Sequence, residues 1–242
     1  MQKSLLFFIA LLSQVAFAQN TLEGNYAINN LITDHEVNEY ILYPRPDAPY
    51  IYGNSVTFRT NGTFTSGYAA ECGNDCFTHA AGTYTMPDES HIRFVVDTVT
   101  VTGDCKHQNY GPHKDLGLYL LLKSDKDIRL LKSSGDAKAD ALTRSYSEAI
   151  DAFDRETANI PNFHPIPARP GGTNTTDDGK VAAALHGNPA FDMAEVKVLY
   201  SKILRSYFQA ILFEHKGKQH IVLCIIHSGY VGLYDPAKWP KK

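Results

Sequence analysis

The sequence has little cysteine and no marked excess of charge of either sign. Its 242 residues include four cysteines, too few for a small scaffold held together by disulfides alone. The 26 acidic and 23 basic side chains give a formal net charge of −3. This balance disfavours a protein that binds nucleic acid through net positive charge, and we expect no nucleic-acid partner. With 43% hydrophobic and 20% charged residues, the composition is that of a folded globular protein.

Long hydrophobic runs are also missing. The apolar run at residues 5–12 has eight residues, whereas a helix that crosses a bilayer needs about 20. No later stretch reaches that length, so we expect no transmembrane segment. Lys3 precedes the run and Ala16-Phe17-Ala18 follows it, which is the pattern of a cleaved signal peptide. We therefore expect residues 1–18 to be removed and the mature protein to be secreted or periplasmic.

The sequence motifs of common enzymes do not occur. G-x-S-x-G, the P-loop, H-E-x-x-H and G-x-G-x-x-G are all absent. We therefore assign no catalytic residue and no cofactor. A hydrolase with a site in the C-terminal part stays open, because catalytic triads assemble in space rather than in sequence.

Two groups of possible metal ligands have weak patterns. The Cys and His residues of the first group do not follow a standard structural zinc spacing. The second group is a pair of histidines that would face each other if Gly217-Lys218 were a two-residue hairpin turn. We expect no metal site at either. The two groups are Cys72, Cys76, His79, Cys105 and His107, and His215 with His220.

Residues 19–133 have the pattern of short strands separated by turns. Asn61-Gly62 and Ser124-Asp125-Lys126 are turn sequences between apolar, β-prone segments. Alternating apolar residues predict that one face of each strand is buried. About eight antiparallel strands would leave two exposed sheet edges unless the sheet closed on itself, so we expect a β-barrel.

Residues 134–242 begin with a helical pattern. Apolar residues from Leu142 to Phe153 recur at helical spacing and predict an amphipathic helix. We expect residues 171–179 to form a loop. Asp192 and Glu195 resemble a capping box that opens a second helix near Met193. A C-terminal hairpin around Gly217-Lys218 would complete this part, which we expect to pack on the barrel.

Residues 24–133 contain several short motifs: Gly24-Asn25-Tyr26, Asn61-Gly62-Thr63-Phe64, Gly82-Thr83-Tyr84 and the pair Cys76 and Cys105. These motifs resemble those of lipocalin-like bacterial export proteins and of the META-type domain. Lipocalins carry Trp where this chain has Tyr26. The resemblance covers these residues alone and implies a small lipocalin-like β-barrel. With the patterns of residues 134–242, we expect an α+β protein in which an antiparallel lipocalin-like β-barrel is followed by two amphipathic helices and a C-terminal β-hairpin. The resemblance also implies an apolar ligand in the barrel and no catalytic machinery.

Four cysteines allow three complete disulfide pairings, and the sequence does not choose among them. We favour Cys76–Cys105, which has roughly the META-type spacing. Cys224 lies in an apolar run and is expected to be a buried thiol unless Cys72 reaches it.

Our principal functional hypothesis is non-covalent binding of a small apolar or amphipathic ligand inside the barrel. The expected lining residues are aromatic, and the same rings could equally form an ordinary core. They are Tyr26, Phe58, Phe64, Tyr84 and Phe94, with Tyr43 and Tyr50 at the rim.

The alternative hypothesis is a protein-interaction or inhibitor module with a filled barrel. Its partner would bind the loop expected at residues 40–52, where tyrosines and prolines are interleaved.

Overall fold

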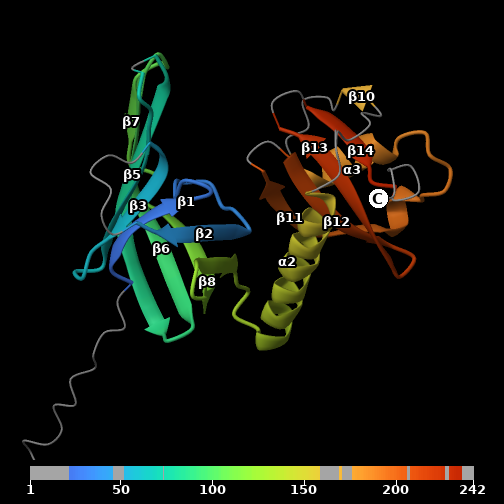
Figure 1. The fold of residues 1–242 in the computed structure, drawn as a ribbon, viewed down its shortest axis with the longest axis horizontal. Helices are drawn as coiled ribbons and strands as arrows, with labels where there is room; N and C mark the ends of the chain where they lie inside the picture. The colour runs from blue at the N-terminus through green and yellow to red at the C-terminus, as the bar shows by residue number, and fades with distance from the viewer. Residues whose placement is uncertain are drawn as a thin grey trace, which may run out of the picture.

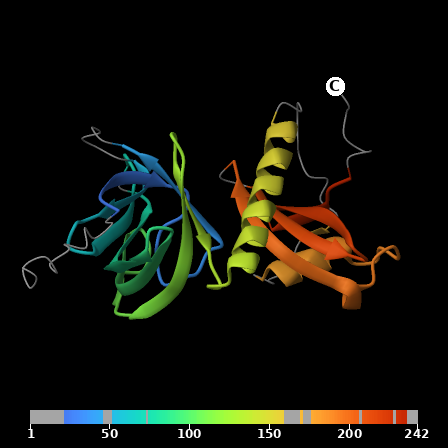
Figure 2. The ribbon, with the colours of Figure 1, turned by 90° about the horizontal axis from the view of Figure 1, so that it is seen from below.

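The computed structural model describes residues 22–45, 52–72, 74–158, 169–170, 176–205, 208–226 and 229–235. These residues form two β-sheets that lie side by side, with the helix α2 between them (Figures 1 and 2). No helix among them is long and apolar enough to cross a membrane.

The first sheet is a closed antiparallel β-barrel, as the sequence predicted. Eight strands follow the order β5-β4-β3-β1-β2-β9-β8-β6, and β6 pairs with β5 to close it. The short strand β7 adds a further pairing to β6. Because β1 lies between β2 and β3, the order departs from a simple up-and-down barrel. The strands are β1 (Gly24–Ile28), β2 (Glu39–Pro44), β3 (Gly53–Phe58), β4 (Thr63–Ala69), β5 (Cys76–Asp88), β6 (His91–Gly103), β7 (Gln108–Tyr110), β8 (Lys114–Lys123) and β9 (Ile128–Lys132).

Both predicted turns form, as does the predicted disulfide. Gly62 has a φ of +78°, and its carbonyl accepts a hydrogen bond from the Tyr84 amide at 2.8 Å. Residues 124–127 connect β8 to β9. Cys76 and Cys105 are bonded, with a Cα–Cα distance of 5.1 Å, and they join the ends of the long strands β5 and β6. Cys72 is an exposed free thiol and Cys224 a buried one, so they do not pair with each other.

The strand β2 corrects the prediction of a loop over residues 40–52. Tyr40 and Leu42 point into the barrel and are fully buried. Glu39 and Ile41 lie on the outer face of the same strand, where they are also buried. A strand that is buried on both faces does not alternate between apolar and polar residues, so this alternation did not reveal β2. Residues 46–51, which include Tyr50, lie outside the described residues.

The second sheet is antiparallel and carries one helix on each face. Its order is β10-β14-β13-β12-β11. The helix α2 packs on one face through Ile150 and Phe153, and α3 packs on the other through Val181 and Leu185. The elements are α2 (Ala137–Thr157), β10 (Arg169–Pro170), α3 (Asp177–Leu185), the 3-10 turn η1 (Met193–Glu195), β11 (Val196–Leu204), β12 (Phe208–His215), β13 (Lys218–Ile225) and β14 (Tyr230–Leu233).

The first predicted helix forms, but its buried face differs from the predicted stripe. The Asp136 carboxylate caps α2 by accepting a hydrogen bond from the Ala139 amide at 2.8 Å. Leu142 is 47% exposed, whereas Ser147 is buried. The reason is that part of α2 faces a polar junction with the barrel rather than an apolar surface.

The second helix lies elsewhere in the chain than predicted. It begins at Asp177, inside the expected loop, and Thr176 caps it through the Gly179 amide at 3.2 Å. The Asp192 cap forms, but it holds only the single turn η1 before the chain enters β11. Since residues of β11 pack into the apolar clusters on both faces of the sheet, they also fit a helical stripe, and only pairing with β12 decides between the two.

The C-terminal hairpin turns one residue earlier than predicted. Lys216 and Gly217 both have positive φ, and His215 pairs with Lys218. His220 therefore stands opposite Phe213 rather than opposite His215.

Candidate functional site

The structure brings together five of the residues expected to bind a ligand in the barrel. They lie inside it, buried, in a single apolar cluster: Tyr26, Phe58, Phe64, Tyr84 and Phe94. Tyr43 does not join them, because it lies on the outer face at the end of β2 and is 45% exposed.

These rings pack against one another in the barrel interior. Phe94 is fully buried, and its ring centroid lies 5.6 Å from Phe64, 5.7 Å from Tyr119 and 6.0 Å from Phe58. The Tyr84 hydroxyl lies 2.7 Å from the carbonyl oxygen of Leu22 and 2.8 Å from that of Arg59. The arrangement has the edge-to-face geometry of a packed aromatic core.

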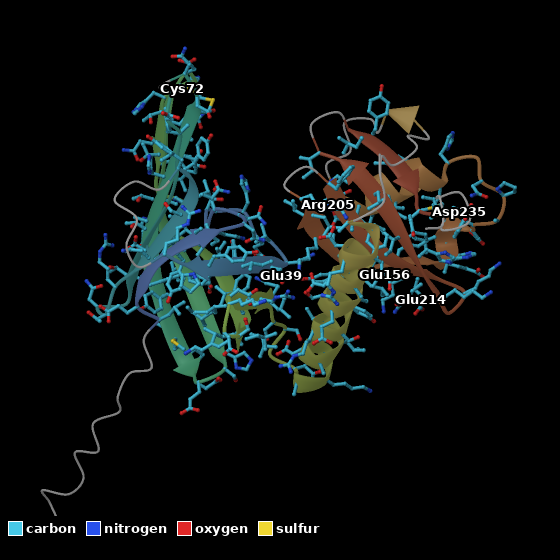
Figure 3. All side chains as sticks on the ribbon, viewed as in Figure 1. Glu39, Cys72, Glu156, Arg205, Glu214 and Asp235 are labelled. Carbon is cyan, nitrogen blue, oxygen red and sulfur yellow. A yellow bond between two sulfur atoms is a disulfide. The ribbon has the colours of Figure 1, made fainter. Side chains whose placement is uncertain are left out.

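A buried group of charges lies where the barrel meets the C-terminal part. Lys202 of β11 places its Nζ 3.0 Å from Glu39 Oε2 and 2.7 Å from Asp151 Oδ1. The Glu39 side chain, from β2 of the barrel, is only 1% exposed and that of Lys202 is 5% exposed. Figure 3 shows Glu39 on the side of the barrel that faces α2 and the second sheet. Charges buried this deeply are stable only when they are paired.

Three further side chains complete this group. Ser147 Oγ and Tyr200 Oη donate hydrogen bonds to Glu39 Oε2 at 3.0 and 2.8 Å. Arg129 Nη1 donates to Asp151 Oδ2 at 2.5 Å. We call the set of Glu39, Arg129, Ser147, Asp151, Tyr200 and Lys202 the junction network.

The junction network sets the charge state of its acid on α2. Burial alone would raise the pKa of Asp151, but hydrogen bonds and charge interactions with Lys202 and Arg129 outweigh it and lower the pKa below its ordinary value. Asp151 is therefore ionised near neutral pH, which keeps the two cations paired.

Two cavities flank the junction network. The first has a volume of about 310 Å³, and we call it the Asp177 cavity. The β1–β2 connection, α3, β11 and β12 form its walls. Its lining residues are mostly polar: Asn29, Asn30, Glu36, Val37, Asn38, Glu39, Asp177, Lys180, Ser201, Lys202, Ile203 and Gln209.

Hydrogen bonds fix the polar groups of the Asp177 cavity. Asp177, in the first turn of α3, accepts hydrogen bonds from Ser201 Oγ and, at 2.8 Å, from Gln209 Nε2. Lys180 Nζ donates to Gln209 Oε1 at 2.6 Å. Asn38 Nδ2, from the barrel, donates to Ser201 Oγ at 3.3 Å, so both parts of the molecule hold this wall.

The second cavity is a groove of about 360 Å³ between the β8–β9 hairpin and α2. We call it the Arg155 groove. Its lining residues are Leu122, Lys123, Ser124, Asp127, Arg129, Leu131, Arg144, Ser147, Glu148, Asp151 and Arg155.

At the Asp177 cavity, the described residues do not bring together the groups that a hydrolase would need. Ser201 contacts the carboxylate of Asp177, but no histidine lines their cavity. Gln209, near the start of β12, lines the cavity, whereas His215 lies at the end of that strand. There the His215 Nε2 accepts a hydrogen bond from the Asp192 amide at 3.2 Å. The described part of the chain therefore contains no Ser-His-acid arrangement at this cavity.

The two hairpin histidines pack around an aromatic ring. Phe191 lies 5.0 Å from His215 and 5.1 Å from His220, measured between ring centroids. Burial, with the nearby charges of His215 and Lys218, lowers the pKa of His220. In the described ranges, no three His, Cys, Asp or Glu side chains are grouped so that they could hold a metal ion.

Sequence reasoning missed both cavities and the junction network. One signal was present, because Glu39 and Lys202 are charged residues next to or within runs that are otherwise apolar or aromatic. A charge in such a run indicates a buried partner. It does not identify that partner, which here lies far away in the sequence.

Comparisons of the chain with protein-family models, with curated proteins and with solved structures gave no match.

Proposed function

We propose that this protein binds a small polar molecule non-covalently in the Asp177 cavity, and that the β-barrel serves as a filled scaffold. One observation carries the proposal. Polar side chains from both parts of the chain converge around open space at this cavity, whereas the barrel interior is occupied by its own rings. A concave site with a few fixed polar groups is the usual form of a ligand site.

The lining of the cavity indicates the chemistry of the ligand. Of the cavity's three carboxylates, Glu36 is paired with Lys114 and Lys132, and Glu39 with Lys202. Asp177 is instead hydrogen-bonded by the neutral side chains of Ser201 and Gln209, and Lys180 Nζ lies 3.7 Å away. The Asp177 carboxylate, held mainly by neutral donors, favours a neutral or cationic molecule over an anion. Amide, hydroxyl and carboxylate groups on the wall suit a ligand that carries hydroxyl and amino groups.

Three sugars of similar size and different charge test this proposal. Titration calorimetry with D-glucosamine, D-glucose and D-gluconate should give the tightest binding for the cation and the weakest for the anion. Replacing Asp177 by Asn removes a charge-assisted interaction and should weaken glucosamine binding by about tenfold or more.

Asp178→Asn is the matched control, since Asp178 is the next residue of α3, is exposed and does not line the cavity. It should bind glucosamine as the unchanged protein does, and thermal unfolding should show both variants folded. Equal affinity in the two variants, or no binding of any of the three sugars, would contradict the proposal.

A further inference from the structure

The Arg155 groove contains more positive charge than the protein itself neutralises. Of its four cations, Arg129 is paired with Asp151. Within the described ranges, Lys123, Arg144 and Arg155 form no ion pair, although all three line the groove. The two remaining acids are Asp127 and Glu148, so three cations stand against two carboxylates.

The helix α2 presents its charges to the groove in a regular pattern. Arg144, Glu148, Asp151 and Arg155 follow one another at spacings of four, three and four residues, which places them along one helix face. The opposite wall is the β8–β9 hairpin, which contributes Leu122, Lys123, Ser124, Asp127, Arg129 and Leu131. Arg155 and Arg144 therefore line a concave surface rather than a convex one.

The carboxylates of the groove do not neutralise all of its cations. Asp127 accepts a hydrogen bond from Ser124 Oγ at 2.8 Å and Asp151 is held by Lys202 and Arg129. The surplus is thus one positive charge, presented largely by guanidinium groups, which bind carboxylates through two parallel hydrogen bonds. Leu122 and Leu131 add apolar surface to the same groove.

We infer that the Arg155 groove is a second ligand site, which binds a small organic monoanion: its carboxylate on the Arg155 guanidinium, its apolar body toward Leu122 and Leu131, with Arg144 adding positive charge further along the groove. This site is separate from the Asp177 cavity and has the opposite charge preference. It therefore does not depend on the function proposed for that cavity.

Benzoate and its neutral isostere benzamide test this inference directly. In NMR titrations of the ¹⁵N-labelled protein at fixed ionic strength, benzoate should shift the amide signals of residues around the groove in a saturable way. Benzamide should bind at least tenfold more weakly, because it lacks the charge that the guanidinium groups recognise. Equal binding of the two compounds would overturn the inference.

Variants of α2 locate the site. The double variant Arg144→Gln and Arg155→Gln should weaken benzoate binding by about tenfold or more. Lys138→Gln removes a positive charge from the same helix at an exposed position outside the groove, and it should leave the affinity unchanged.

A charge-preserving variant separates recognition from folding. Arg155→Lys keeps the charge but loses the paired hydrogen bonds, so its affinity should fall between those of the unchanged protein and Arg155→Gln. Full benzoate affinity in the double variant, or an equal loss in Lys138→Gln, would show that benzoate does not bind at the groove.

Discussion

The barrel interior and the domain junction are both deeply buried, yet they are stabilised by opposite chemistry. The interior consists of aromatic rings whose hydroxyls reach backbone carbonyls at its edge, as Tyr26 and Tyr84 do. The junction instead buries Glu39, Asp151 and Lys202 in mutual contact. Apolar packing gains stability from almost any well-fitting neighbour, whereas a buried charge depends on particular partners.

This difference suggests different roles for the two regions. In the described part of the barrel, the interior rings pack on one another, and these contacts hold the strands in place. The junction network adds little net stability over an apolar contact, since desolvation offsets most of the attraction between the charges. It does fix how the barrel meets α2 and β11, and both cavities border it.

The largest effect is expected in the barrel interior. Phe94→Ala removes a fully buried ring that contacts Phe58, Phe64 and Tyr119, and it should lower the free energy of unfolding by about 3–5 kcal/mol. Urea unfolding measures this loss. The control is Tyr52→Ala, at a ring 53% exposed, which should change stability by about 0.5 kcal/mol or less. A loss below about 1 kcal/mol for Phe94→Ala would mean that the interior is not tightly packed.

At the junction, a single substitution should lower the free energy of unfolding by a similar or slightly smaller amount. A second substitution should recover part of that loss. Lys202→Met leaves the buried Glu39 carboxylate without its nearest cation and should cost about 3 kcal/mol. Adding Glu39→Leu removes the unpaired charge, so the double variant should be more stable than Lys202→Met alone. If the two losses simply add in urea unfolding, the charges are not coupled and the contrast with the barrel interior fails.

The smallest effect is a pH dependence confined to the junction. The pKa of Asp151 is lowered in the folded protein, so its ionised form contributes stability above the unfolded value of about 3.9. That contribution is lost as the pH falls through the folded-state pKa. Asp151→Asn should therefore be less stable than the unchanged protein at pH 7, with the difference shrinking as the pH falls below about 4.

Other acids titrate in both proteins, including Asp88, whose hydrogen bond with His91 is the main cause of a pKa lowered to about 2. Their contribution cancels in the comparison with Asp151→Asn. Phe94→Ala should keep the pH slope of the unchanged protein, because the ring carries no titratable group. A constant difference between Asp151→Asn and the unchanged protein as the pH falls would contradict the prediction.

The barrel could be predicted because its signals are local. The turn at Asn61-Gly62 and the alternation of Val56 and Phe58 depend only on neighbouring residues, and they produced the correct hairpin. The strand β11 was mistaken for a helix because both of its faces are covered, one from the side of α2 and the other by α3. Its periodicity therefore carried no information about which structure it forms.

The sequence by itself determined the closed sheet and the first long helix, whereas it favoured the Cys76–Cys105 disulfide only through a resemblance in spacing. Only the tertiary structure decided where open space remains and which charges meet. Lys202 lies 163 positions from Glu39 and 51 from Asp151. Sequence patterns depend on residues that are close together in the chain. The partners of a buried charge depend instead on how elements from distant parts of the chain pack together.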